Sequence, residues 1–442
     1  MVIESLKYKI LQQFGFAPTQ EQGQALDTFV SFLTDRDPQA VMILRGSAGT
    51  GKTSLSGAIV RTLLQIRQKV MLLAPTGRAA KVFSLGSGAP AYTIHRRIYR
   101  EKAFAGVDGQ FSLNDNLYTD TLFMVDEASM IANMGLGGTT FGSGCLLDDL
   151  VKFVYQGHND RLLLIGDKAQ LPPVGEEESP ALSASVMEGY GLKVYECDLN
   201  EVLRQSQSSG ILYNATLIRQ MITHDAVTGL PLIRFKGFAD IVMMPGAELV
   251  ESLGDSYHHV GLDETMVITR SNKRANIYNN GIRNMVLDRE EELSSGDMLM
   301  IVKNNYFWTE KEKKESGEGS AGAVPAFLAN GDRAKVLRVS NYIELYGFRF
   351  ATLLLQLPDY DDYEMQVTGM LDTLQSEAPA LTHEQQEELF RQVEEDYQHF
   401  VPLKADRMKS IRQDAYFNAL QVKYAYAVTC HKAQGGQWAH VY

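Results

Sequence analysis

The sequence predicts an α/β protein with two domains that each contain a parallel sheet, and with a small β module inserted into the second. Its 442 residues exceed what one ordinary hydrophobic core accommodates. The first third alternates short apolar runs with helical patterns, which is typical of parallel strands joined by crossover helices. A second such pattern begins near Thr265 and is interrupted by a segment rich in β-branched and aromatic residues.

Four apolar runs in the first third are expected to be strands of one parallel sheet. Each ends in a polar or glycine-containing stretch, after which a new segment begins. Ligands bind at the carboxyl ends of the strands in such sheets, so the residues that follow these runs are the candidates for chemistry. The runs are Val41–Leu44, Val70–Ala74, Leu122–Val125 and Leu162–Ile165.

The second half contains a similar but interrupted pattern. Met266–Thr269 is predicted to be a strand and Asn272–Val286 a helix. Thr309–Ala326 is charged, then small and polar, and is expected to be a flexible loop. Asp332–Leu357 is predicted to form the β module, and the parallel pattern resumes at Tyr424–Thr429.

A helix is predicted inside the insertion. Thr382 is followed by Gln385, which is a capping-box pattern, and the helix continues to about His399. The expected domains are residues 1–200, with a hairpin insertion at about 96–118; 201–290 as the first part of the second domain; 291–415 as the inserted β module with an acidic helical segment; and 416–442 as the return to the second domain.

The composition favours a soluble protein of a reducing cytoplasm. Apolar residues make up 45% and charged residues 22%, and no apolar run reaches the roughly 18 residues of a membrane span. The N-terminal stretch has no signal-peptide pattern. Cys145, Cys197 and Cys430 are far apart, which argues against a disulfide framework or a zinc site.

The net charge of −12 argues against a nucleic-acid partner, because phosphate binding needs Lys and Arg. A groove that holds one strand, however, needs only a local basic surface. Much of the acidity lies in Asp359–Glu395, which is expected to be a solvated accessory surface.

The segment from Gly46 to Thr53 has the GxxxxGK[ST] pattern directly after a predicted strand. Glycines let backbone N–H groups surround the β-phosphate, Lys52 reaches the β- and γ-phosphate oxygens, and the Thr53 hydroxyl binds Mg²⁺. The alternative is an ordinary glycine turn. The candidate nucleotide-binding residues are Gly46, Ser47, Ala48, Gly49, Thr50, Gly51, Lys52 and Thr53.

Two further strand ends carry candidate catalytic residues. Asp126 would hold Mg²⁺ through water, and Glu127 would orient and deprotonate the attacking water. Gln170, in Gly166–Val174, is positioned to contact the γ-phosphate. The alternatives are acidic turn residues at the first strand end and a proline-terminated loop at the second.

The ordered motifs resemble superfamily 1 helicases, specifically the RecD-like and phage Dda-like group of superfamily 1B. The P-loop is followed by Ala74–Lys81, Thr93–His95, Asp126–Met130 and Gly166–Val174. Leu203–Gln205 and Ala427–Gly436 extend the resemblance, which spans residues 18–442. It implies two RecA-like P-loop domains with an SH3-like β insertion, use of ATP and Mg²⁺, and 5′-to-3′ movement.

The resemblance also implies roles for single residues, each with an alternative. Gln22 corresponds to the adenine-recognising glutamine, although Thr19 and Gln22 also form a capping-box pattern. Arg204 resembles an arginine finger, and the alternative is a surface salt bridge. Gly435 is a candidate nucleotide contact. Candidate DNA contacts are Pro75, Thr76, His95, Thr429, His431 and Lys432, of which the two histidines are otherwise structural hydrogen-bonding residues.

Phe111 is the candidate for the residue that separates the strands at the duplex junction. Asp108-Gly109 between two strand-like runs predicts a hairpin, and related helicases stack a hairpin aromatic on the duplex at this place. The alternative is an aromatic side chain packed on its own domain.

The family's motif VI is absent before Tyr442, and we expect a chain truncated before this motif. The expected function is an ATP-dependent helicase acting on single-stranded DNA and single-strand/duplex junctions. The expected protein is a cytoplasmic monomer that does not bind membranes and has replication or repair proteins as further partners. One alternative is an ATP-switched nucleic-acid-binding factor without unwinding activity, and another is a P-loop ATPase acting on protein.

Overall fold

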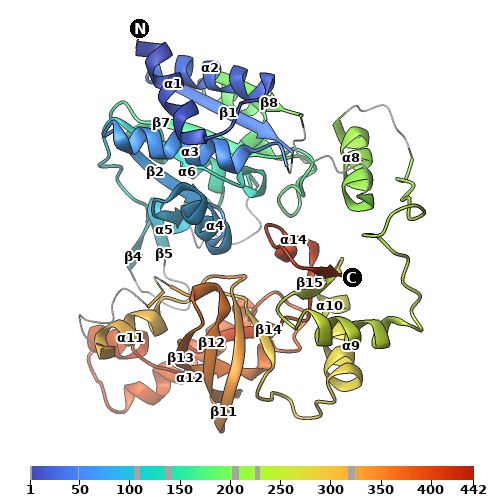
Figure 1. Ribbon diagram of the computed structural model, residues 1–442. Coiled ribbons are helices and arrows are strands. Elements are labelled where there is room, and N and C mark those ends of the chain that lie inside the picture. Colours follow the sequence, from blue (N-terminus) through green and yellow to red (C-terminus); the bar gives the residue numbers. More distant parts are fainter. Residues whose placement is uncertain are drawn as a thin grey trace. The chain divides into compact units, whose positions relative to one another are not determined.

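The computed structural model describes residues 2–47, 49–103, 110–134, 142–201, 209–223, 229–316, 324–325 and 327–442. The chain forms two compact units (Figure 1). The first contains Met1–Ala103 and Gly109–Met243, and the second contains Met244–Tyr442. In the described part of the chain, no helix has the length and apolar character needed to cross a membrane.

The first unit is built on a six-stranded sheet in the order β3-β2-β6-β7-β1-β8, in which every pair is parallel. The four apolar runs predicted to be strands are confirmed as β1, β2, β6 and β7. The sequence did not predict β3 and β8, which lie at the two edges of the sheet. The strands are β1 Ala40–Gly46, β2 Lys69–Ala74, β3 Ala91–Thr93, β6 Thr121–Val125, β7 Arg161–Gly166 and β8 Lys193–Leu199.

Helices cover both faces of this sheet, and the alternation of side chains along each strand explains why. Met42 and Leu44 of β1 enter one hydrophobic cluster, while Val41 and Ile43 enter the other. Because successive strand residues point to opposite faces, a strand buried on both sides is apolar throughout. The helices on the first face are α1 Val2–Phe14, α2 Gln20–Thr34, α3 Lys52–Gln65 and α4 Gly77–Ser87; those on the second are α5 Ile94–Ile98, α6 Leu146–Gln156 and α7 Ala184–Gly189.

Two smaller features complete the described part of the first unit. Strands β4 (Tyr99–Ala103) and β5 (Gln110–Leu113) pair antiparallel, with Tyr99 opposite Leu113. Helix α8 (Gly210–Thr223) follows the sheet in the chain.

The second unit contains a three-stranded parallel sheet with β9 (Thr265–Thr269) at its centre, between β15 (Ala427–Thr429) and β16 (His440–Val441). The predicted strand at 266–269 is therefore confirmed. The helix predicted over 272–286 is also confirmed, as α10 followed by one π-helical turn. The helices here are α9 Leu249–His259, α10 Asn272–Gly281, the π-helix η3 Ile282–Val286 and α14 Cys430–Ala433.

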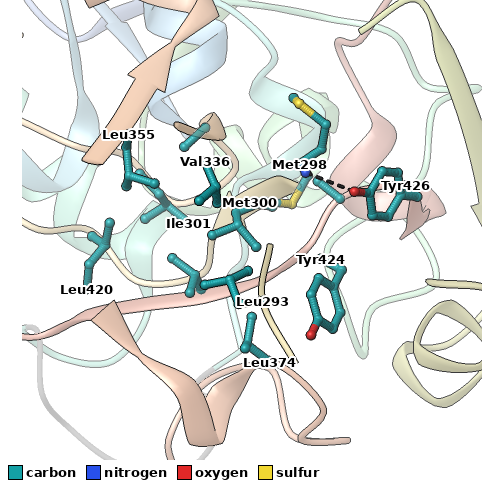
Figure 2. Packing of buried hydrophobic residues seen from close by; sticks show 14 of the residues in the cluster. Leu293, Met298, Met300, Ile301, Val336, Leu355, Leu374, Leu420, Tyr424 and Tyr426 are labelled. Carbon is teal, nitrogen blue, oxygen red and sulfur yellow. Dashed lines mark hydrogen bonds between the residues drawn. The ribbon is translucent and has the colours of Figure 1, made fainter. Parts of the chain in front are cut away.

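A closed five-stranded barrel is inserted between β9 and β15, which confirms the predicted β module. Its interior is filled by side chains such as Val336, Leu355 and Leu420, and Tyr426 lies at its edge (Figure 2). Strand β14 belongs to the barrel, and the chain returns to the parallel sheet only at β15. The barrel strands are β10 Met298–Ile301, β11 Arg333–Leu345, β12 Phe348–Leu357, β13 Tyr363–Met370 and β14 Leu420–Tyr424.

Two helices, α12 (His383–Gln398) and α13 (Lys404–Arg412), lie in the connection from β13 to β14. The predicted capping box of α12 is confirmed, because Thr382 and Gln385 each accept a hydrogen bond from the other's backbone N–H.

The flexible loop expected over 309–326 is wrong for its first part, where the chain forms helix α11 (Phe307–Ser316). Lys and Glu are good helix formers. Trp308 is 5% exposed and its Nε1 donates to the Asn418 carbonyl at 2.9 Å. Tertiary packing of one aromatic residue therefore anchors a segment whose composition suggested a loop. Residues 317–323 and 326 lie outside the described part of the chain.

Candidate active site

The loop between β1 and α3 has the backbone that a phosphate-binding loop requires. Gly49 and Gly51 have φ values of 84° and 82°, a region that glycine adopts without the penalty of a side chain. A Cβ on Gly46 would lie 2.9 Å from both Leu199 Cβ and Thr50 Oγ1, so this position has no space for a larger residue. Ala48, a predicted member of this loop, lies outside the described residues.

Lys52 is the first residue of α3, and its ammonium group is enclosed by the loop. It donates to the carbonyls of Gly46 and Ser47, the latter at 2.8 Å. Burial lowers the pKa of Lys52, and the carboxylates of Asp167, Asp126 and Glu127 oppose that effect. A partly buried cation beside the N-terminus of a 14-residue helix provides the positive potential that a polyphosphate needs.

Gln22 is held in the capping box at the start of α2. Its Oε1 accepts from the Thr19 N–H at 3.0 Å, and the Thr19 hydroxyl accepts from the Gln22 N–H. Its Nε2 donates to the Thr50 carbonyl of the P-loop at 2.9 Å. Gln22 is 1% exposed, so in this conformation it links α2 to the phosphate-binding loop, a contact that the sequence did not predict.

The carboxylates of Asp126, Glu127 and Asp167 lie near the ammonium group of the P-loop residue Lys52. Strands β6 and β7 are neighbours, with Val125 opposite Leu164, so the residues that follow them lie at the same edge. Burial raises the pKa of Asp126. Burial and the adjacent Asp126 raise the pKa of Glu127 to about 7, while Lys52 opposes this rise.

Gln170 and Ser129 contact the same acidic end. The Gln170 side chain hydrogen-bonds the Glu127 carboxylate, and the Ser129 hydroxyl donates to Gln170 Oε1 at 3.1 Å. The structure thus brings together Lys52, Glu127 and Gln170, three of the four residues predicted to be catalytic. The fourth, Arg204, lies outside the described residues.

These residues fit a magnesium nucleotide. Thr53 is the second residue of α3 and is exposed, and Asp126 hydrogen-bonds the Glu127 N–H through only one carboxylate oxygen, at 2.9 Å. Mg²⁺ in nucleotide sites takes one or two protein oxygens together with phosphate oxygens and water. Thr53 would supply a protein oxygen, and Asp126 would hold the ion through water.

The predicted DNA contacts of the first unit have structural partners. Thr76, which follows Pro75, caps α4 by accepting from the Ala79 N–H at 3.2 Å. His95 is mostly buried, which lowers its pKa, and its ring lies 5.7 Å from that of Tyr99. Phe111 packs against the hydrophobic cluster on one face of the six-stranded sheet. This is the geometry of the alternative given for it, an aromatic side chain packed on its own domain.

The predicted contacts of the second unit lie in and after β15. Thr429 ends this strand, and His431 and Lys432 lie in α14. Gly435 has a φ of 77°. Burial, together with the neighbouring charge of Lys423, lowers the pKa of Lys432 to about 8.

Sequence patterns missed several residues of these sites. Asp167 follows β7 directly and was singled out only as part of a motif. Ser129 lies within a predicted motif but had no assigned role. Lys423 and Arg219 carry no motif signal, and only the structure brings their charges near Lys432 and Lys52, respectively.

The fold and this site define a P-loop nucleotide-binding protein, and comparisons with known proteins show what it is similar to. The family model described as AAA domain matches residues 17–229. The ATP-dependent RecD2 DNA helicase of Deinococcus radiodurans is 30% identical over 157 residues, which are 35% of this chain and 18% of that protein. The ATP-dependent DNA helicase dda of Enterobacteria phage T4 is 25% identical over 267 residues, which are 58% of this chain and 55% of that protein.

These matches bear out the resemblance of the ordered motifs to superfamily 1B helicases. An uncharacterised protein of Methanocaldococcus jannaschii is 33% identical over 168 residues, and the match covers only 13% of that protein. A crystal structure of Pif1 helicase from Bacteroides with ADP-AlF3 and single-stranded DNA has 13% identity and a TM-score of 0.46, with 96% of this chain and 86% of that chain covered.

Proposed function

We propose that this chain is an ATP-dependent DNA helicase that moves 5′ to 3′ along single-stranded DNA and couples ATP hydrolysis to duplex unwinding. The observation that carries the proposal is the arrangement of Lys52, Asp126, Glu127 and Gln170 around the ends of β1, β6 and β7. The similarity to the RecD2 and dda DNA helicases supports DNA as the polymer, and the direction follows from the resemblance to the RecD-like and Dda-like group.

In the proposed reaction, Lys52 and the P-loop backbone bind the β- and γ-phosphates of ATP. Mg²⁺, held by Thr53 and Asp126, would neutralise charge on the same phosphates. Glu127 accepts a proton from the attacking water while the new P–O bond forms, and the bond from the γ-phosphorus to the bridging oxygen breaks to release ADP. Arg204 would stabilise the charge that develops, and Gln22 and Gly435 would contact the nucleotide.

DNA binding is proposed at the residues that follow β2, β3 and β15. Pro75, Thr76 and His95 would contact the strand from the first unit, and Thr429, His431 and Lys432 from the second. Phe111 would serve at the junction only if its hairpin leaves the packed position described above. Stacking on one base contributes about 1–3 kcal/mol, so loss of the Phe111 ring would change the free energy of DNA binding by a measurable amount.

The test is ATP hydrolysis with and without single-stranded DNA, measured for the unchanged protein, Lys52→Ala and Lys152→Ala. Lys152 is an exposed lysine paired with Asp148 on α6, and its loss is the matched control for a change of one positive charge. We expect DNA-stimulated hydrolysis that Lys52→Ala abolishes and Lys152→Ala leaves unchanged. Normal hydrolysis in Lys52→Ala would overturn the site assignment.

Strand separation distinguishes the remaining alternatives. We expect release of the labelled strand from a duplex with a 5′ single-stranded tail and not from one with a 3′ tail. DNA-stimulated hydrolysis without strand release would support an ATP-switched binding factor. Hydrolysis that is indifferent to DNA would support a P-loop ATPase with a protein substrate.

A further inference from the structure

The carboxylate of Glu21 holds the chain where it leaves β8. Helix α2 and strand β8 lie side by side in the first unit (Figure 1), and Glu21 is the second residue of α2. Its Oε2 accepts hydrogen bonds from the backbone N–H groups of Asn200 at 2.5 Å and Glu201 at 2.8 Å, and its Oε1 accepts from the Asn200 side-chain amide at 3.4 Å. One side chain therefore satisfies two successive N–H groups directly after the strand.

The end of β8 supports the start of the phosphate-binding loop. Leu199 is the last residue of the strand, and its carbonyl accepts a hydrogen bond from the Ser47 N–H at 3.4 Å. A Cβ on Gly46 would lie 2.9 Å from Leu199 Cβ, so the strand end also packs closely against the loop. The residue that contacts the loop therefore directly precedes the two residues that Glu21 holds.

The neighbour of Glu21 supports the other end of the same loop. Gln22 is 1% exposed, and its Nε2 donates to the Thr50 carbonyl at 2.9 Å. The capping box with Thr19 fixes Gln22 at the start of α2. Two adjacent residues of one helix end thus restrain the P-loop at both of its ends, Gln22 directly and Glu21 through the end of β8.

We propose that Glu21 is a positioning residue for nucleotide binding. It fastens the end of β8 to the start of α2 and so keeps the P-loop ordered before a nucleotide arrives. A loop that is already ordered loses less conformational entropy when it binds a ligand, and Glu21 therefore strengthens binding through Leu199 and Ser47. The inference rests on the proposed use of ATP and adds a residue to it.

The sign of the effect separates this role from simple electrostatics. A carboxylate near the site repels a polyphosphate, so loss of its charge alone would strengthen nucleotide binding. Loss of its hydrogen bonds would instead loosen the loop and weaken binding. Glu21→Gln removes the charge but keeps a carbonyl oxygen that can accept from both N–H groups, whereas Glu21→Ala removes the charge and the acceptor.

The test is titration of the unchanged protein and its variants with a fluorescent, non-hydrolysable ATP analogue and Mg²⁺. We expect Glu21→Ala to raise the dissociation constant about 3- to 10-fold, and Glu21→Gln to leave it unchanged or lower it. Asp27→Ala is the matched control, because it removes an exposed carboxylate that pairs with Lys7 from the same helix, and its dissociation constant should equal that of the unchanged protein. A value in Glu21→Ala at or below that of the unchanged protein would overturn the proposal, and so would an equal rise in Glu21→Gln.

Steady-state hydrolysis distinguishes preorganisation of the loop from general damage to the site. In Glu21→Ala, the KM for ATP should rise, while kcat at saturating ATP should stay within about 2-fold of the unchanged value, because the bound nucleotide restores the same loop conformation. A fall in kcat with an unchanged KM would place the effect of Glu21 on the chemical step and would overturn the proposal.

Glu201→Pro tests the same link from the other partner. Proline removes one of the two N–H donors, while the carboxylate of Glu21 remains. We expect the dissociation constant to rise as in Glu21→Ala, with no further rise when the two changes are combined. An unchanged dissociation constant in a folded Glu201→Pro protein would reject the proposal, whether or not Glu21→Ala folds.

A measurement without nucleotide distinguishes this inference from the proposed function. Hydrogen exchange of the nucleotide-free protein, followed by mass spectrometry of the peptide that contains Ser47, reports how firmly the start of the loop is held. Exchange should be faster in Glu21→Ala and unchanged in Asp27→Ala, even if the unchanged protein hydrolyses no ATP. Equal exchange in Glu21→Ala and the unchanged protein would reject the positioning role even if hydrolysis is normal.

Discussion

Glu127 combines an unfavourable backbone with a buried carboxyl group. Its φ of 51° and ψ of 37° lie in the left-handed region, which costs a residue with a side chain about 1–3 kcal/mol. The carboxyl group is held beside Asp126 and Lys52, with its pKa raised to about 7. Such combinations persist where the surrounding structure enforces them, and they are concentrated at catalytic sites.

Glu127→Gln should therefore leave nucleotide binding intact and reduce turnover by about 10²- to 10⁴-fold, the usual contribution of a general base. In the unchanged enzyme, kcat should be lost as the pH falls through about 7, because the base must be ionised and its pKa is raised to that value. Fluorescent nucleotide binding and steady-state ATPase assays measure the two effects. A turnover independent of pH between about 6 and 8 would remove Glu127 from this role.

Lys432 provides a second pH-dependent group, in the second unit. Burial and Lys423 lower its pKa to about 8, and burial alone lowers the pKa of Lys423 to about 8. A lysine binds phosphate only when protonated, so affinity for single-stranded DNA should fall as the pH rises through this value. Fluorescence anisotropy at constant salt measures this fall, which Lys432→Arg should largely remove because arginine stays charged.

At the scale of elements, one buried carboxylate joins several parts of the second unit. Asp297 is fully buried before β10 and accepts hydrogen bonds from Arg283 of η3 at 3.0 Å, Arg289 at 2.6 Å and the Tyr426 hydroxyl at 2.7 Å. Tyr426 lies between β14 and β15, and its hydroxyl also accepts from the Met298 N–H at 3.2 Å (Figure 2). The network therefore connects the barrel to the parallel sheet.

Asp297→Ala should destabilise the second unit by about 3–5 kcal/mol, because it leaves the buried Arg283 and the partly buried Arg289 without their carboxylate partner. Burial alone would raise the pKa of Asp297, but hydrogen bonds from Arg283, Ser294 and Tyr426 hold it below its usual value. Its contribution to stability is therefore present above the unfolded pKa and is lost as the pH falls through the folded one. Urea unfolding at about pH 7 measures the first effect, and urea unfolding well below about pH 4, where the carboxyl of the unfolded chain is protonated, measures the second. Equal stability of the variant and the unchanged protein at neutral pH would contradict this account.

At the scale of the whole molecule, each unit has a hydrophobic core of its own. The six-stranded sheet has one cluster on each face, and the second unit has a large cluster in the barrel and the adjoining sheet. A smaller cluster lies between the barrel and the helices α12 and α13. Separate cores are the physical basis for separate unfolding transitions.

Leu353→Ala should lower the stability of only one of two calorimetric transitions. Leu353 is fully buried in the barrel, and replacing a buried leucine by alanine costs about 2–5 kcal/mol. Differential scanning calorimetry should show one transition at a lower temperature and the other unchanged. A uniform shift of a single transition would show that the two units unfold together.

The sequence by itself determined the central strands and which candidate residues follow them. Strands β1, β2, β6 and β7 are predictable because burial on both faces makes them apolar at nearly every position. Lys52, Asp126, Glu127 and Gln170 could be proposed from the sequence, because nucleotide binding and hydrolysis use these residue types in the segments that follow such strands. Local sequence patterns were sufficient to predict an element wherever burial or ligand binding constrains residues that are close together in the chain.

Only the tertiary structure decided the features that depend on partners distant in sequence. The edge strand β8 is partly exposed and therefore carries no continuous apolar run. Helix α11 depends on the contact of Trp308 with Asn418, 110 residues away. The hydrogen bond from Ser129 to Gln170 spans 41 residues, and the link from Gln22 to the P-loop spans 28. Such contacts leave no periodic signal, because their energy arises when separate segments pack and not from the preference of either segment alone.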